Sequence, residues 1–333
     1  MTLFRIILLL LLYEKSKQAI MNDSTAPLVF DDLMNDAISI IFSFIERKES
    51  DWLHVILVCK RWFSIGKKVF DPSVCNNWAI RWASAYGHLR LVQELLKDPR
   101  VHPSYFNNYA IKWASCNGHL QVVQELMKDP RVDPSTSDNL AIRWASCNGN
   151  LQVVQELLKD PRVDPSDDDN YAIRLASENG HLQVVEELLE DSRVDPSVHD
   201  NITIQRASDS GNLQVVLELL KDPRVDPSAN NNRTIRCASI NGHIQVVQEL
   251  LKDTRVDPST MNNAAIRWAS ESGHIQIVQE LLKDPRVDPS SEGNYALLWA
   301  FNNGHSQVIE ELLKDERVSI LHNKKRKKES SKE

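Results

Sequence analysis

The sequence has few cysteines, and their spacing excludes the sites that cysteines usually form. Its 333 residues include 5 cysteines, an odd number, and no group of them has the spacing of a zinc ligand set. Cys116 and Cys147 are 31 residues apart, at the same position of two neighbouring repeats. Stacked helices lie about 8–10 Å apart, which exceeds the Cα separation of about 7 Å that a disulfide tolerates. We therefore expect free thiols, as in a reducing compartment.

The sequence also lacks catalytic and cofactor-binding motifs. It contains no Ser–His–Asp pattern, no glycine-rich phosphate loop and no HExxH metal site. We therefore predict no catalytic residue, no metal and no cofactor, and we interpret the chain as a binding protein instead of an enzyme. The net charge is −7, and the basic tail of residues 324–333 leaves −11 on the remainder, so general binding of nucleic acid is not expected.

Long apolar runs are missing as well, apart from residues 6–13 near the N-terminus. This run (IILLLLLY) is shorter than the about 20 residues that a membrane-spanning helix needs. Glu14, Lys15 and Lys17 follow where a signal cleavage site would lie. We interpret residues 1–20 as an apolar extension ahead of a working start at Met21. A secretory signal or membrane anchor is one alternative, and a buried helix is another.

Most of the chain consists of a motif that recurs eight times with a period of 31 residues, AIRWASxxGHLQVVQELLKDPRVDPS. A fixed period of this length indicates stacked supersecondary units, which usually offer binding surfaces. In the second unit, Gly118 separates two helical segments, and Pro130 ends the second one. Asn108, which precedes the first segment, is expected to be its N-cap. Each unit is therefore predicted to be helix, tight turn, helix and long turn.

This unit resembles the ankyrin repeat. The family pattern TPLHxAAxxGHxxVVxxLL stands here as AIRWASxxGHLQVVQELL, and units of this style are similar to those of amoebae and their giant DNA viruses. The period is about two residues shorter than the usual 33, which puts the hairpin tips of the family in doubt but not its helix pairs. The resemblance implies a solenoid whose concave side binds a partner.

Residues 28–72 lie outside the repeats and resemble an F-box, most specifically in the VCKRW sequence of residues 58–62. Met34 and Asp36 stand where that family usually has proline and glutamate. The resemblance implies docking onto a Skp-type adaptor of a cullin–RING ubiquitin ligase, and a plain helical cap on the repeats is the alternative. The residues predicted to bind the adaptor are Leu33, Ile38, Ile41, Phe42, Phe44, Leu53, Val58 and Trp62.

Three residue columns recur along the repeats, and we interpret them as structural. The aspartate before the second proline, such as Asp133, is expected to cap a turn. The histidine after each glycine, such as His119, is replaced by Asn150 and Asn212 in two repeats, which a metal or catalytic role would not allow freely. The tryptophan of the first helix is expected to pack between repeats, and a role in partner binding is the alternative.

Positions that differ between repeats are better candidates for partner contacts. They lie in the long turn and just before each glycine, and in ankyrin proteins both sets line the concave side. Neutral drift is the alternative explanation of this variation. The residues predicted to bind a partner are Tyr86, Tyr105, Phe106, Asn117, Asp167, Glu178, His199, Asp209, Met261 and Glu271.

The predicted fold is all-α, with short turns and hairpin-like loops. A three-helix F-box (residues 28–72) precedes an ankyrin-like solenoid of about eight 31-residue repeats (residues 77–320) and a basic disordered tail (residues 321–333). The KKRKK sequence of residues 324–328 is typical of a nuclear import signal. The expected location is therefore the cytoplasm or the nucleus, of a host cell if the protein is viral.

The predicted function is substrate recognition for a Skp/cullin/F-box-type ubiquitin ligase. The F-box would dock on the adaptor subunit of the cullin complex, and the repeats would bind a target protein that the sequence does not identify. The alternative is a non-catalytic ankyrin scaffold or inhibitor of a protein partner, without a ligase role. No membrane partner is expected unless residues 1–20 are a genuine part of the protein.

Overall fold

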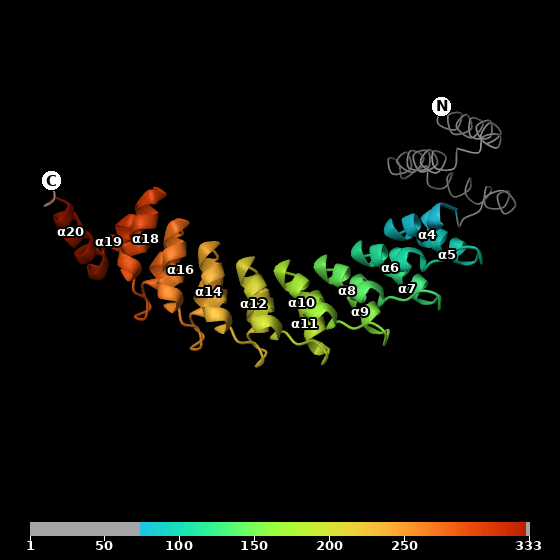
Figure 1. Cartoon of the computed structure of the whole chain (residues 1–333). Coiled ribbons are helices and arrows are strands. Elements are labelled where there is room, and N and C mark those ends of the chain that lie inside the picture. The colour runs from blue at the N-terminus through green and yellow to red at the C-terminus, as the bar shows by residue number, and fades with distance from the viewer. Residues whose placement is uncertain (1–73, 331–333) are drawn as a thin grey trace, which may run out of the picture. The chain divides into compact units, whose positions relative to one another are not determined.

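The computed structural model of the protein describes residues 74–330 (Figure 1). The expectations for residues 1–20 and 28–72, including the eight residues predicted to bind an adaptor, lie outside the described residues.

Contacts within the chain divide it into two units. The described part of the first unit consists of residues 74–79 and 98–101. The second unit contains the remaining described residues, which form the row of repeats.

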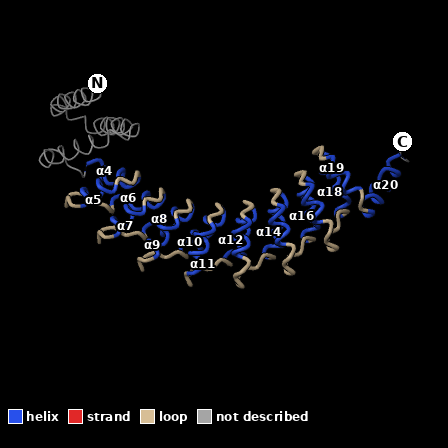
Figure 2. The backbone as a smooth tube through the Cα atoms, turned by 180° about the vertical axis from the view of Figure 1, so that it is seen from behind, coloured by secondary structure: helices blue, strands red, loops and turns tan. Residues whose placement is uncertain are grey.

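The described residues form eight helix pairs and one further helix, as the period predicts. The first helices of the pairs are α4 (Val74–Ala85), α6 (Tyr105–Cys116), α8 (Thr136–Cys147), α10 (Asp167–Glu178), α12 (Val198–Asp209), α14 (Ala229–Ile240), α16 (Thr260–Glu271) and α18 (Ser291–Asn302). The second helices are α5 (Leu89–Leu96), α7 (Leu120–Met127), α9 (Leu151–Leu158), α11 (Leu182–Glu190), α13 (Leu213–Leu219), α15 (Ile244–Leu250), α17 (Ile275–Leu281) and α19 (Ser306–Leu313). Helix α20 (Glu316–Ser330) follows the last pair. Figure 2 shows helices and loops but no strand in this part of the chain, so the long turns carry no β-hairpin.

Apolar side chains at helical spacing form a continuous core along the row. In the second repeat, Ile111 of α6 and Val123 and Leu126 of α7 are completely buried, and Val132 of the long turn is 1% exposed. Ala114 of α6 is also buried, and such small side chains let neighbouring first helices contact each other more extensively than the second helices do. Closer packing on one side makes a stack of repeats curve toward that side. Figure 1 shows the first helices on the inner side of the curved row, as this packing requires.

Each tight turn except the last, at Gly304, is completed by a side chain of the next repeat. Gly118 has a φ of +74°, a left-handed conformation that favours glycine, and an added Cβ would lie 2.7 Å from Asn150 Oδ1. Asn150 Nδ2 donates to Cys116 O at 2.8 Å, and His119 Nε2 contacts Ala85 O at 3.0 Å in the same way. Both side chains present a nitrogen to a carbonyl at the end of the preceding first helix. Histidine and asparagine are therefore interchangeable here, which supports the structural interpretation of this column.

Asn108 and the asparagines at the same position of the next five repeats do not act as N-caps, which corrects the prediction. Asn108 has a φ of +60° and follows two other left-handed residues, Phe106 and Asn107. Its Oδ1 accepts a hydrogen bond from the backbone N–H of Asp133, 25 residues later, at 2.9 Å. The left-handed backbone directs this side chain toward the long turn that ends the repeat, instead of toward the first turn of the helix that follows.

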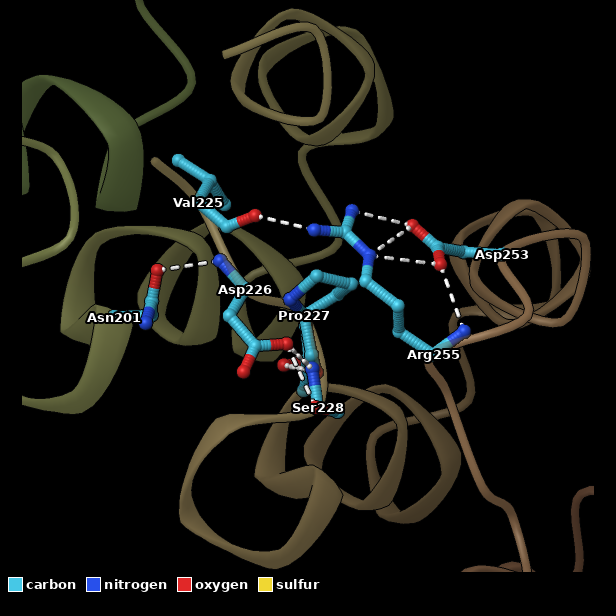
Figure 3. Close-up of polar contacts among 8 residues, drawn as sticks. Asn201, Val225, Asp226, Pro227, Ser228, Asp253 and Arg255 are labelled. Atoms are coloured by element: carbon cyan, nitrogen blue, oxygen red, sulfur yellow. Dashed lines mark hydrogen bonds and ion pairs between the residues drawn. The ribbon is translucent and has the colours of Figure 1, made fainter. Parts of the chain in front are cut away.

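Two further sets of contacts order the long turns (Figure 3). Asp226 Oδ1 accepts hydrogen bonds from Ser228 N at 2.9 Å and from Ser228 Oγ at 2.7 Å, which confirms the predicted turn cap. Arg255 of the next long turn donates from Nη2 to Asp253 at 2.6 Å and from Nη1 to Val225 O at 2.9 Å. The same contacts recur in the neighbouring long turns, so each loop is tied to the loop before it.

The C-terminal segment is helical up to Ser330, where a disordered tail was expected from residue 321. In the last repeat, Glu316 replaces the proline that ends most second helices, and Ile320 replaces the second proline of the long turn. Because proline is absent, the chain continues as α20, which packs on α18 and α19. Phe301 of α18 is 69% exposed, whereas the serine at this position of the inner repeats is buried by the following repeat.

Candidate binding surface

The two sets of predicted contact residues lie at opposite ends of the first helices. The turn row, which precedes the right-handed part of each helix, consists of Tyr105, Phe106, Asp167, His199 and Met261. The helix-end row, which precedes the tight turn, consists of Tyr86, Asn117, Glu178, Asp209 and Glu271. The right-handed part of each first helix between the two rows has about nine residues, which at 1.5 Å per residue separates the rows by roughly 13 Å. They therefore flank a band that the first helices form between them.

The turn row contains large side chains in a strained backbone conformation. Phe106, His199 and Met261 have φ values of +51° or +52°, and a left-handed conformation costs about 1–2 kcal/mol for a residue with a Cβ. The next two residues of each described turn are asparagine, aspartate or glycine, which tolerate this conformation. The first residue varies instead, and Phe106 and Met261 are 54% and 53% exposed. Side chains that the fold neither needs nor buries are suited to contact a partner.

Two residues of the turn row are exceptions: one is His199, whose Nε2 lies 2.8 Å from Asp169 Oδ2, and the other is Asp167. Its Oδ2 accepts a hydrogen bond from Asn139 Nδ2 at 2.8 Å, and its Oδ1 accepts one from the backbone N–H of Asp168 at 2.8 Å. The carboxylate is therefore engaged within the fold. Tyr105 is 38% exposed, and its ring lies edge-on to that of Phe106, with the centroids 5.0 Å apart.

Much of the helix-end row takes part in contacts between repeats. Asn117 Nδ2 donates to Ala85 O at 2.8 Å, and Asp209 Oδ1 accepts from Asn241 Nδ2 at 2.8 Å. Tyr86 has no such role and is 53% exposed. Variation at the helix ends is therefore partly explained by stacking of the repeats and not by partner binding alone.

The two glutamates of the helix-end row, Glu178 and Glu271, are partly exposed. Glu178 Oε1 lies 3.8 Å from Arg206 Nη1, and both side chains are well exposed to solvent, so the ion pair contributes little stability. Arg206 stands at the tryptophan position of the fifth repeat. At this pair, the tryptophan position of the first-helix band therefore holds a charged side chain instead of an aromatic one.

The tryptophan column packs between repeats, as interpreted, yet stays partly exposed. The rings of Trp113 and Trp144 meet edge to face with their centroids 5.3 Å apart, and the ring of Tyr109 lies 5.7 Å from that of Trp113. In the middle repeats the column is filled by Leu175, Arg206 and Cys237. Aromatic surface is therefore concentrated in the repeats on either side of the middle.

The position before each tryptophan was missed as a contact candidate. It carries arginine or lysine in six of the eight repeats, and this repeated cation next to an aromatic residue was the available signal. Lys112 is 7% exposed, and its Nζ donates to Ser137 Oγ at 3.0 Å. Burial lowers the pKa of Lys112 below its ordinary value. Arg143, in the next repeat, instead pairs with Asp168 at 2.5 Å.

In later repeats the same position stabilises the strained turn. Arg236 Nε donates to Asn231 O at 3.0 Å, and Arg267 Nε donates to Asn262 O at 2.9 Å. Each acceptor is a carbonyl of a left-handed residue in the same repeat. A guanidinium group that satisfies these carbonyls offsets part of the conformational cost of the turn.

Charge divides the first-helix band into segments. Helices α4 and α6 contain no carboxylate, whereas α10 contains four. Helix α14 again contains none and carries Arg233 and Arg236. A partner that spans several repeats meets cationic, acidic and again cationic surface in a fixed order, which favours one register of binding.

Other kinds of site have no support in this part of the chain. Among residues 74–330, no cluster of histidine, cysteine, aspartate or glutamate side chains is arranged to hold a metal ion. None of the helices described combines the length and the apolar character that crossing a membrane requires.

The comparisons with known proteins agree with the repeat architecture. A family model for ankyrin repeats matches three segments, residues 78–169, 142–233 and 234–324. Together these segments cover about three quarters of the 333 residues. The family models detect no F-box in the chain. A search of the curated proteins finds no match.

Proposed function

Because the chain belongs to the ankyrin repeat family, we propose that it is an adaptor that holds a target protein on its first-helix band and delivers it to a ubiquitin ligase. Ankyrin repeats imply protein–protein interaction, and the chain has no catalytic motif of its own. The observation that carries target binding is the turn row, where the large side chains of Phe106 and Met261 are exposed although the left-handed turn does not require them.

Delivery would work by proximity. Hydrogen bonds that join residues 30 to 35 positions apart link each repeat to the next at the tight turn and at the long turn. These links make the row stiff, so a bound target is held at a fixed place on the repeats. Fixing two reactants next to each other replaces a diffusive encounter and accelerates transfer without a catalytic residue.

The ligase half of the proposal rests on the resemblance of residues 28–72 to an F-box. We propose that Phe42 and Trp62 insert into a groove of a Skp-type adaptor, as in helix-in-groove recognition. The test is capture of a purified Skp-type adaptor by the full chain and by its Phe42→Ala/Trp62→Ala variant. Capture by the wild type and loss in the variant are expected. Equal capture by both, or capture by neither, removes the ligase role.

A matched control uses the repeats. Phe106→Asn changes an exposed side chain of the turn row, and repeat six already has Asn230 in the same conformation. This variant should capture the adaptor as well as the wild type does, because adaptor docking and target binding use different parts of the chain. Loss of adaptor capture in this control would mean that the two activities are not separable as proposed.

The second candidate function is a scaffold or inhibitor that masks its partner without promoting degradation. It is favoured by the absence of a detected F-box. The two candidates differ in one measurement, the abundance of the captured target with and without a proteasome inhibitor. A rise in target abundance on inhibition supports the ligase adaptor, and an unchanged abundance supports the scaffold.

The location of the protein in the cell is a separate part of the proposal. We propose that residues 324–328 act as a nuclear import signal. Fusion of the full chain to a fluorescent protein, with these five basic residues replaced by glutamine, tests this. An unchanged distribution between nucleus and cytoplasm would contradict it.

A further inference from the structure

Repeats two and three carry a patch of aromatic and cationic side chains that the partner-contact prediction captured only in part. We call it the aromatic patch, and it consists of Tyr105, Phe106, Tyr109, Lys112, Trp113 and Trp144. Its rings form a connected series, because Tyr109 contacts Trp113 and Trp113 contacts Trp144. Arg81 of the first repeat lies over the rings of Phe106 and Tyr109, at 4.8 and 5.1 Å from their centroids. Rings of this kind dominate the energy of many protein interfaces.

Lys112 is the buried charge within this patch. Its side chain is 7% exposed, and the hydrogen bond of its Nζ goes to the neutral hydroxyl of Ser137. No carboxylate described lies within ion-pair distance of it. At the same position of the next repeat, Arg143 does have a carboxylate, that of Asp168, at 2.5 Å. A buried ammonium group that is bonded to a hydroxyl alone gains free energy when an anion approaches it.

The surroundings of the patch also carry little negative charge. Helices α4 and α6 have no aspartate or glutamate, and α8 has one, Asp138. The chain as a whole has a net charge of −7, so a cationic stretch of this length departs from the acidic balance of the chain. Charge complementarity at an interface selects partners and speeds their association.

We infer that the aromatic patch binds an acidic segment of a protein partner that also carries an aromatic or aliphatic side chain. The carboxylate of that segment pairs with Lys112, and its apolar side chain packs against Phe106 and Trp113. This inference rests on the proposed function, since it names the chemistry of the target that the repeats recruit.

A nucleic acid could also place an anion and a base on such a patch. The observations favour the acidic peptide, because the turn that follows in repeat four presents Asp167, Asp168 and Asp169 in succession. A polyphosphate chain that extended beyond repeat three would meet these carboxylates and be repelled. A short acidic segment can stop before them.

The repeats themselves supply substitutions that the fold is known to accept. Asn230, Gln205 and Leu175 occupy the positions of Phe106, Lys112 and Trp113 in other repeats. The test variant is therefore Phe106→Asn/Lys112→Gln/Trp113→Leu. The control variant is Arg236→Gln/Cys237→Leu, which gives repeat six the same three residues because Asn230 is already present.

The probes are fluorescein-labelled random copolymers of glutamate and tyrosine and of glutamate alone, with binding to the full chain followed by fluorescence polarisation. The glutamate–tyrosine copolymer is expected to bind, and more tightly than polyglutamate. The test variant should weaken its binding by about tenfold or more, as loss of a cluster of hot-spot side chains does. The control variant should bind as the wild type does. Thermal melts followed by circular dichroism verify that both variants are folded.

Three results would overturn the inference. They are equal binding by the wild type and the test variant, no binding of the glutamate–tyrosine copolymer, and binding of a fluorescein-labelled single-stranded RNA that the test variant abolishes. In each case, crosslinking of the full chain to cellular proteins separates the inference from the proposed function. A protein that crosslinks to the wild type and the test variant alike leaves target binding intact at another segment, and absence of any crosslinked protein removes both.

Discussion

Replacement of a tight-turn glycine by alanine should reveal how strongly neighbouring repeats depend on each other. Gly149 has a φ of +71°, and a Cβ there would lie 2.6 Å from His181 Nδ1 of the next repeat. Gly304 has a φ of +74°, and a Cβ there would meet nothing within 4 Å. Both substitutions impose the same backbone strain, but Gly149→Ala alone also displaces a side chain of the following repeat.

The two costs can be separated by their causes. The left-handed conformation costs alanine about 1–2 kcal/mol, and lower entropy of the unfolded chain offsets about 0.4–1 kcal/mol of this. Gly304→Ala should therefore destabilise the protein by about 1 kcal/mol. Gly149→Ala also weakens the contact of His181 Nε2 with Cys147 O, which is 2.9 Å long and worth about 1 kcal/mol. Overpacking adds about 1–3 kcal/mol, so the total should be about 3 kcal/mol or more.

The assay is urea denaturation followed by circular dichroism, with hydrogen exchange to locate the repeats that open first, because repeat proteins can unfold in parts. The double variant Gly149→Ala/His181→Ala removes the ring that the new Cβ would strike. It should be less destabilised than the sum of the two single variants. Equal losses of stability for Gly149→Ala and Gly304→Ala would refute the reasoning, since the inter-repeat contact would then contribute nothing.

Three other outcomes are expected. Phe106→Asn should leave the free energy of unfolding unchanged or raise it by up to about 1 kcal/mol, because asparagine tolerates the left-handed conformation better than phenylalanine. A loss of stability in urea denaturation would show instead that the phenylalanine ring supports the fold. Arg255→Met should destabilise the protein by about 1 kcal/mol, because it loses the hydrogen bond to Val225 O. Lys252→Met removes only an exposed ion pair and should change stability little. A larger loss of stability for Lys252→Met than for Arg255→Met in urea denaturation would be inconsistent with the long-turn contacts. Hydrogen bonds from Arg255 lower the pKa of Asp253 below its ordinary value of 3.8. The stability that this pair contributes is therefore present above pH 3.8 and is lost as the pH falls through the lower pKa of the folded state. Asp253→Asn should make the loss of stability in acid less steep, and an unchanged acid transition would argue against this linkage.

Much of the repeat could be predicted from the sequence because its signals are local. Gly118 at the tight turn and the apolar spacing of residues 120–127 predict the helix pair without reference to any other repeat. The turn cap formed by Asp226 and Ser228 spans two residues, so it too could be inferred from a short stretch of chain. The helix α20 was missed, although the replacement of both prolines by Glu316 and Ile320 was visible in the sequence.

The binding surface was less predictable, because it depends on which side chains the stacking leaves exposed. Variation between repeats pointed correctly to the exposed Phe106 and Met261, but it pointed equally to Asn117 and Asp209, which form hydrogen bonds between repeats. A single sequence cannot distinguish these two reasons for variation. Lys112 was overlooked because it resembles the arginines of its column, and its lack of a neighbouring carboxylate is a property of the assembled repeats.

The amino-acid sequence by itself determined the period, the two helices of each repeat, the glycine turn between them and the all-helical class. The tertiary structure decided what the recurring asparagines, histidines and arginines do: Asn294, His181 and Arg255, for example, bond partners that are 24, 34 and 30 residues away. Local propensity sets the backbone of one unit, which cannot bury its apolar face alone. The partner that satisfies a polar side chain, and the side chains that remain outside, are settled only when the next unit packs against it.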